Sequence, residues 1–260
     1  MGTILSLAMQ KGGVGKTTTT KNTAKELAKL NYKVLLVDED AQGSLTKVST
    51  NAIALSKSGA PTMFDMYVNG VEMSDIIIPI DENIDLAPAL INLSRAELSL
   101  TNAISRESFL KRALNKVKDQ YDYILIDCPP SLGLLTLNAL NASDFVIFVV
   151  QLEYFALQGV EQLETTVGQV VESLNPNLVT LGVIETMNDN TNHTTDISQE
   201  INNLNKYEIL GIVDRATDVR DAIMNKEAIS EFKPTHKVAT QYKNFALNLV
   251  NVLNKSKEVK

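Results

Sequence analysis

Near its start the chain reads Met9-Gln10-Lys11-Gly12-Gly13-Val14-Gly15-Lys16-Thr17-Thr18. A short apolar run, residues 4–8, precedes this stretch, and a helical pattern over residues 17–30 follows it. A strand, a glycine-rich loop and a helix in that order are the setting of a phosphate-binding loop. Glycines let successive backbone N–H groups converge on one anion, and the helix adds the positive end of its dipole. The stretch therefore predicts a nucleotide-binding protein.

The residues of this loop have distinct expected roles. Lys16 would supply its charge to the β- and γ-phosphates, and the Thr17 hydroxyl is suited to ligate Mg²⁺. The ordinary pattern G-x-x-x-x-G-K-[ST] has glycine where this chain has Gln10, and a second lysine, Lys11, stands at the start of the loop. Lys11 is either a solvated surface charge or a functional group. The predicted phosphate cradle consists of Lys11, Gly12, Gly13, Val14, Gly15, Lys16, Thr17 and Thr18.

Composition places the chain among globular proteins. Its 260 residues are 44% hydrophobic and 21% charged, which allows a sizeable core. The single cysteine, Cys128, excludes a disulfide framework and suits a reducing cytoplasm. No apolar run approaches the roughly 20 residues that a membrane span needs.

Charge is unevenly spread along the chain. The net charge of −7 argues against a generally basic nucleic-acid binder. Residues 206–260, however, hold ten Lys/Arg and seven Asp/Glu, a local +3, so the first 205 residues carry −10 (14 minus 24). A local basic face on an acidic protein is therefore possible.

Apolar runs alternate with helical patterns, which predicts parallel strands joined by crossover helices. We expect an α/β fold, a doubly wound and mostly parallel sheet with helices on both faces. One domain over residues 1–260 is expected, because no linker rich in Pro, Gly or Ser divides the chain. A helix is predicted over residues 105–118, and residues 41–79 show only weak patterning. The strands are predicted at residues 4–8, 33–37, 84–88, 123–127, 145–150, 179–186 and 209–213.

Several polar groups follow these predicted strands. In a doubly wound sheet ligands bind beyond the carboxyl ends of the strands. The glycine loop, residues 38–40, Asp127 and residues 186–188 all fall there, so we expect them to converge on one edge. Asp127 is the second candidate Mg²⁺ residue, acting through water. Asp40 is the candidate that orients the attacking water in hydrolysis, with Asp38 at the metal side or structural; alternatively both simply cap the next helix.

Three segments carry a resemblance to a known family. The form K-G-G-x-G-K-T, with Lys11 in front, resembles the deviant phosphate loop of the ParA/MinD/nitrogenase-iron-protein superfamily. Asp38-x-Asp40-x-Gln42-Gly43 resembles the D-x-D-P-Q-G-N segment of ParA-type partition ATPases, with Ala41 and Ser44 departing from it. Residues 121–131 are similar to that family's Walker B signature. The similarity runs from residue 1 to about 250, and the chain is identified as a member of the ParA/Soj family.

The resemblance implies an ATPase switched by dimerisation. Two subunits would enclose two ATP molecules with Mg²⁺, and Lys11 would reach the partner's nucleotide, joining Lys16 and Asp40 as catalytic residues. A ParB-type centromere-binding protein would stimulate a slow hydrolysis. The homodimer would bind DNA non-specifically in the cytoplasm, at the nucleoid, with no membrane involved and no N-terminal helix-turn-helix domain.

The resemblance also suggests base and DNA contacts. The adenine pocket would use the segments after the sixth and seventh strands, with Met187, Asn188 and Asp214 as candidates. Residues 219–222 resemble the V-R-x-x-E-A stretch that carries a DNA-binding arginine, here Arg220, and Lys243 is the second candidate. The patch could extend over Lys226, Lys233 and Lys237, which bind phosphates if they are not merely solvated.

Two other functions remain open. A MinD-like membrane ATPase for division-site placement needs an amphipathic C-terminal helix. Here residues 245–253 space apolar groups for packing on the body, and the tail 255–260 has only Val259 as an apolar anchor. A metabolic or metallocluster-assembly ATPase of the Mrp type usually carries a C-x-x-C pair, which this sequence lacks.

Overall fold

The computed structural model describes residues 2–203 and 206–258. Eight strands form one sheet in the order β3-β4-β2-β5-β1-β6-β7-β8. The strands are β1 (Thr3–Ala8), β2 (Val34–Asp38), β3 (Ile78–Asp81), β4 (Ile84–Ala87), β5 (Tyr123–Asp127), β6 (Phe145–Gln151), β7 (Val179–Asn188) and β8 (Ile209–Asp214). Neighbouring strands pair in parallel except β3 and β4, which are antiparallel. The predicted mostly parallel sheet is confirmed, and β3 is the strand that the sequence pattern missed.

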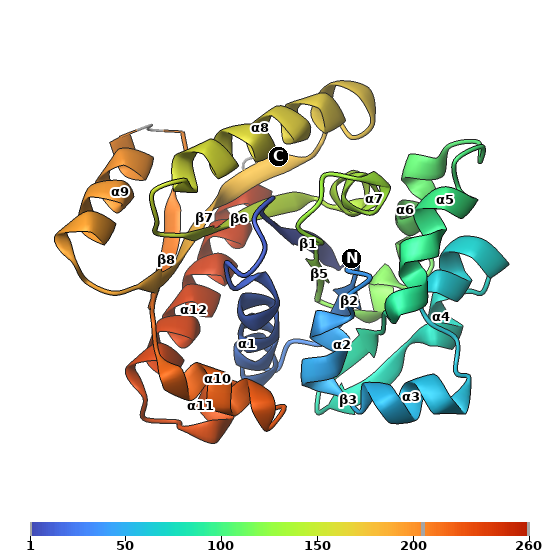
Figure 1. Ribbon diagram of the computed structural model, residues 1–260, viewed down its shortest axis with the longest axis horizontal. Coiled ribbons are helices and arrows are strands. Elements are labelled where there is room, and N and C mark those ends of the chain that lie inside the picture. The colour runs from blue at the N-terminus through green and yellow to red at the C-terminus, as the bar shows by residue number, and fades with distance from the viewer. Residues whose placement is uncertain (1, 204–205, 259–260) are drawn as a thin grey trace.

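Helices cover both faces of this sheet, with α7 and α8 on one side and α1 and α12 on the other (Figure 1). The helices are α1 (Lys16–Lys29), α2 (Ser44–Ser49), α3 (Ala52–Ser58), α4 (Met73–Ile76), α5 (Ala96–Ser99), α6 (Phe109–Leu114), α7 (Leu134–Ala142), α8 (Ala156–Ser173), α9 (Asn192–Asn203), α10 (Thr217–Met224), α11 (Ile229–Phe232) and α12 (Lys237–Glu258). Within the described residues no helix is both long and apolar enough to cross a bilayer.

The helix predicted over residues 105–118 is shorter than expected. Only α6 is α-helical there, and 3₁₀ turns flank it. Ser105 has a φ of 52°, a left-handed conformation that an α-helix does not tolerate. Asn138 of α7 then holds the segment after Ser105, because its Oδ1 accepts from the Leu110 amide and its Nδ2 donates to the Arg106 carbonyl. Tertiary hydrogen bonds thus replace the first turn of the expected helix.

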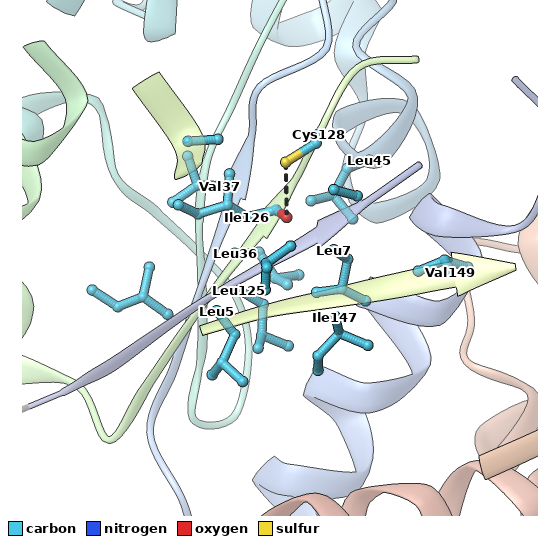
Figure 2. Packing of buried hydrophobic residues seen from close by; sticks show 14 of the residues in the cluster. Leu5, Leu7, Leu36, Val37, Leu45, Leu125, Ile126, Cys128, Ile147 and Val149 are labelled. Carbon is cyan, nitrogen blue, oxygen red and sulfur yellow. Dashed lines mark hydrogen bonds between the residues drawn. The ribbon is translucent and has the colours of Figure 1, made fainter. Parts of the chain in front are cut away.

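The core lies between the central strands and the helices on either side. Figure 2 shows Leu5 and Leu7 of β1 beside Leu36 of β2, Leu125 of β5 and Ile147 of β6, all fully or almost fully buried. Strands buried on both faces read as nearly continuous hydrophobic runs, which is why the sequence pattern located them. Each buried Leu or Ile contributes about 1.5–3 kcal/mol relative to an exposed one.

The register of these strands positions the site. Asp127 pairs with Leu7 of β1 on one side and with Asp38 of β2 on the other. The carboxyl ends of β1, β2 and β5 are therefore level. On the far side of β6, Gln151 pairs with Thr186 of β7. The predicted convergence of these strand ends on one edge is confirmed.

Candidate nucleotide-binding site

The glycine loop has the conformation of an anion cradle. Gly13 and Gly15 have φ angles of 80° and 94°, which L side chains rarely adopt. A Cβ built on Gly13 meets no atom within 4 Å, so open space lies beside this residue. Gly15 is the N-cap of α1, where unpaired N–H groups and the helix dipole favour an anion. Loop and helix together fit a phosphate.

Lys16 lies folded beneath the loop. Its side chain is 7% exposed, and Nζ donates to the carbonyls of Met9 and Lys11, both at 3.1 Å. Burial lowers the pKa of Lys16, and the negative charge of nearby Asp127 opposes that shift. The amine is therefore held at the start of the loop by two backbone carbonyls.

Thr17 and Asp127 are in direct contact. The Thr17 hydroxyl donates to Oδ2 of Asp127 at 2.6 Å, while the buried Oδ1 has no hydrogen-bond partner among the described residues. Burial raises the pKa of Asp127 to about 7, against the lowering effects of the Thr17 hydrogen bond and the Lys16 charge. An unpaired buried carboxylate oxygen beside a hydroxyl fits Mg²⁺, which binds through one or two protein groups plus phosphates. The described residues contain no cluster of three His, Cys, Asp or Glu that could hold a metal alone.

Asp38 and Asp40 have different surroundings. Asp38 is fully buried, and its Oδ2 accepts from the amide of Thr46 at 2.8 Å and from its hydroxyl at 2.7 Å. Of the two expectations for Asp38, this geometry fits the structural one, since the carboxylate fastens the first turn of α2. Asp40 is only partly buried, and its Oδ1 accepts from the Gln42 amide at 2.8 Å. Among the described residues its second oxygen has no hydrogen-bond partner.

Lys11 does not turn towards its own loop. Its ammonium forms an ion pair with Glu153, in the segment between β6 and α8. The next two residues, Tyr154 and Phe155, are 79% and 60% exposed and stack edge to face with ring centroids 5.0 Å apart. The rim of the loop thus carries an accessible lysine beside two exposed aromatic rings.

A largely apolar cavity of about 320 Å³ opens beside the loop, where Gly15 and Thr18 form part of its wall. Met187 and Asp214, both predicted base contacts, line it. The third candidate, Asn188, does not line the cavity, but its Nδ2 donates to Oδ1 of Asp214 at 3.3 Å. Among the other lining residues, sequence reasoning missed Val219, Ile223 and Met224 of α10 and Tyr242 of α12 as cavity walls. The i, i+4 spacing of Val219 and Ile223 was the available signal.

The candidate DNA-binding residues are placed apart. Arg220 is exposed on α10 and also lines the apolar cavity beside the loop, whereas Lys243 lies on α12 at a separate groove with Lys29 and Leu247. Two further lysines proposed for the patch are already neutralised, because Lys233 pairs with Asp218 and Lys237 with Asp214. Neither Arg220 nor Lys243 forms an ion pair within the described residues.

Known proteins are similar to this chain in sequence and in architecture. An AAA-domain family matches residues 2–180. The sporulation initiation inhibitor protein Soj of Bacillus subtilis is 42% identical over 250 residues, or 95% of this chain and 97% of Soj. The chromosome partitioning protein ParA of Myxococcus xanthus is 38% identical over 82% of this chain and 75% of its own length. The chain belongs to the ParA/Soj family of ATPases.

Solved structures of nucleotide-binding proteins have the same fold as this ParA/Soj-type ATPase. A putative plasmid partition protein from Borrelia burgdorferi bound to AMPPNP has a TM-score of 0.83 at 26% identity, covering 96% of this chain and 99% of that one. Cobyrinic acid a,c-diamide synthase from Mycobacterium smegmatis with bound ADP and magnesium has a TM-score of 0.81 at 34% identity, covering 98% and 97%. Nucleotide and Mg²⁺ binding are therefore features of this ParA-like fold.

Proposed function

We propose that this partition ATPase is a DNA-binding switch driven by ATP. Two copies enclose two ATP molecules, and the dimer binds DNA without sequence preference at the nucleoid. A ParB-type partner then stimulates hydrolysis, which separates the subunits and releases the DNA. The single-domain organisation over residues 1–260 is part of the same proposal.

The observation that carries this proposal is the position of Lys11. Its side chain is 47% exposed, and it pairs with Glu153 instead of folding onto its own loop as Lys16 does. An exposed ion pair is worth only about 0–1 kcal/mol, so Lys11 can leave Glu153 at little cost. That geometry supports a role for Lys11 at the nucleotide of a second copy.

The hydrolytic step is assigned to residues on the level strand ends. Asp40 would orient water in line with the γ-phosphate, and Lys16 would stabilise the charge that develops there. The residues that would hold Mg²⁺ are Thr17 and Asp127, and the metal would neutralise phosphate charge. Asp38 keeps α2 in place, so that Asp40 stays at the rim of the site.

DNA, and not a lipid surface, is the proposed target of the dimer. Arg220 and Lys243 leave their charges free for phosphates. The apolar side of α12 is packed against the body, with Tyr242, Phe245 and Leu249 at 3% exposure or less. This burial disfavours the MinD-like alternative, although its anchor candidate Val259 lies outside the described residues.

Size-exclusion chromatography with light scattering tests the proposal, using wild type, Asp40→Ala and Lys11→Ala with and without ATP. We expect wild type to dimerise with ATP, Asp40→Ala to stay dimeric for longer, and Lys11→Ala to remain monomeric while still binding nucleotide. If wild type and Asp40→Ala both stay monomeric with ATP bound, the dimer is wrong. Binding to anionic vesicles but not to duplex DNA would instead favour the MinD-like function.

A further inference from the structure

One buried lysine outside the loop joins three segments of the site. Lys21 of α1 is 8% exposed, a low value for a lysine. Its Nζ donates to the carbonyl of Val48 at 2.5 Å and to that of Lys226 at 2.6 Å. The first acceptor lies in α2, and the second lies in the turn after α10. One ammonium therefore links α1, α2 and the α10 turn.

Each linked segment leads to a different part of the nucleotide site. Helix α1 begins with Lys16 and Thr17 at the phosphate loop. Helix α2 directly follows residues 40–43, and Asp38 fastens its first turn through Thr46. Helix α10 supplies Val219, Ile223 and Met224 to the wall of the base cavity. Phosphate, attacking-water and base positions are thus connected through Lys21.

The α10 turn needs such a connection. Of the eight residues of α10 only Ala222 is buried, so little apolar packing holds this helix. The neighbouring contacts of α1 fasten α11 instead, since Asn22 accepts from the Ile229 amide and Lys25 pairs with Glu231. Hydrogen bonds from a charged donor are roughly twice as strong as neutral ones. Lys21 is therefore well placed to fix the end of α10.

We propose that Lys21 is a positioning residue for ATP hydrolysis, which holds α2 and α10 in register with the phosphate loop. It acts on Asp40 through α2 and on the nucleotide base through α10, and touches neither water nor base. Its effect on turnover rests on the role proposed above for Asp40, whereas its effect on nucleotide affinity does not.

The electrostatic environment gives this role a signature. Burial lowers the pKa of Lys21 to about 8, the charges of Glu231 in α11 and Asp81 in β3 oppose that shift, and Lys25 and Lys226 add to it. Glu227, which follows Lys226 in the turn, lines a cavity together with Lys21. Above pH 8 the ammonium loses a donor and its charge, so both hydrogen bonds weaken. Hydrolysis should then decline on the alkaline side.

The test compares Lys21→Met, Lys21→Arg and the control Lys25→Met, which removes a cation one turn further along α1. We expect Lys21→Met to raise the KM for ATP and the Kd of a fluorescent ATP analogue, and to lower kcat, each by about five-fold or more, as loss of buried hydrogen bonds implies. Lys25→Met should keep wild-type values. A cavity of about 250 Å³ beside Lys21 leaves room for the larger guanidinium, so Lys21→Arg should restore activity at pH 7.

The pH profile distinguishes positioning from general stability. Wild type should lose kcat/KM near pH 8, and Lys25→Met should lose it at a higher pH, because removing the Lys25 charge raises the pKa of Lys21. Lys21→Arg should show no such decline, because its guanidinium does not titrate there. The proposal is overturned if Lys21→Met matches Lys25→Met, if it lowers only the melting temperature, or if Lys21→Arg keeps the wild-type decline. Should Lys21→Met not fold, Lys21→Arg alone decides. If the dimer assay fails but these kinetic effects are observed, the proposed partition switch is wrong and the positioning role of Lys21 still holds.

Discussion

Glu39 is a buried acid at the residue next to Asp40. It has no exposed surface, and the Tyr67 hydroxyl donates to its Oε1 while Oε2 has no partner among the described residues. Burial raises the pKa of Glu39 to about 8; the Tyr67 hydrogen bond lowers it, and the charges of Asp38 and Glu97 raise it further. The folded chain therefore binds more protons than the unfolded chain between pH 4.5 and pH 8. Over that window Glu39 makes the free energy of unfolding fall as pH rises.

Replacing Glu39 by Gln should remove this dependence. The amide keeps an oxygen that accepts from Tyr67 and carries no charge. We expect the variant to melt at least about 2 °C above wild type at pH 8, and no higher than wild type at pH 4.5, since 1 kcal/mol shifts Tm by about 2–4 °C in domains of this size. Thermal unfolding followed by circular dichroism at both pH values measures this. An equal shift at both pH values would contradict the role of the charge.

At the scale of elements, the sequence predicted those strands and helices that a local pattern of apolar residues marks. Central strands such as β1 and β5 are buried on both faces and so appear as unbroken apolar runs. Edge strand β3 reads Ile78-Pro79-Ile80-Asp81 and is half exposed. It therefore does not appear as an unbroken apolar run, and the sequence pattern did not predict it. The helices between residues 44 and 76 have seven residues or fewer, too few to repeat a helical pattern. The broken start of α6 depends on Asn138, which is distant in sequence, so no local pattern contains it.

Gly43 is an element boundary that demands glycine. It is the N-cap of α2 with a φ of 60°, and a Cβ there would lie 2.7 Å from the carbonyl oxygen of Ala89. Gly43→Ala combines left-handed strain with this clash, so we expect a loss of about 2–4 kcal/mol in the free energy of unfolding and slower ATP hydrolysis.

Gly59→Ala is the matched control for this variant. Gly59 has a φ of 67°, and no atom lies within 4 Å of its Cβ position, so only the strain of about 1–2 kcal/mol applies. Urea unfolding of both variants measures the difference. Equal losses in the free energy of unfolding would mean that the clash between the new Cβ at residue 43 and the Ala89 carbonyl is relieved without cost.

On the scale of the whole molecule, the fold brings together site residues whose proximity the sequence predicted only in part. The sequence pattern predicted that the phosphate loop, Asp40 and Asp127 lie close together, because they follow parallel strands whose carboxyl ends share one edge of the sheet. The apolar cavity beside the loop was not predicted in this way, since α10 and α12 reach it from the last part of the chain. Nothing local in the sequence indicates that Tyr242 lies beside the phosphate loop.

Charge distribution leads to a prediction for DNA binding. We expect Arg220→Ala and Lys243→Ala to weaken binding of the ATP-bound protein equally for all duplex sequences. In a dimer, losing one phosphate contact per copy should reduce the slope of log K against log salt by about 1.8. Fluorescence anisotropy between low and moderate salt measures the slope.

Two controls accompany that measurement. Lys116→Ala removes an exposed lysine paired with Glu72 and should leave the slope unchanged. Because Arg220 also lines the apolar cavity proposed for the base, ATP affinity must be measured for Arg220→Ala alongside DNA affinity. Slopes that stay at the wild-type value in both Arg220→Ala and Lys243→Ala would place the DNA surface elsewhere.

The core around β5, which ends at Asp127, has a practical consequence for labelling this protein with a fluorophore. Cys128, the next residue, is 1% exposed among the side chains in Figure 2, and burial raises the pKa of its thiol far above neutrality. A covered, protonated thiol does not react with maleimides. A cysteine introduced at one exposed position would therefore be the sole reactive thiol, so a fluorophore can be attached there without altering the native sequence elsewhere.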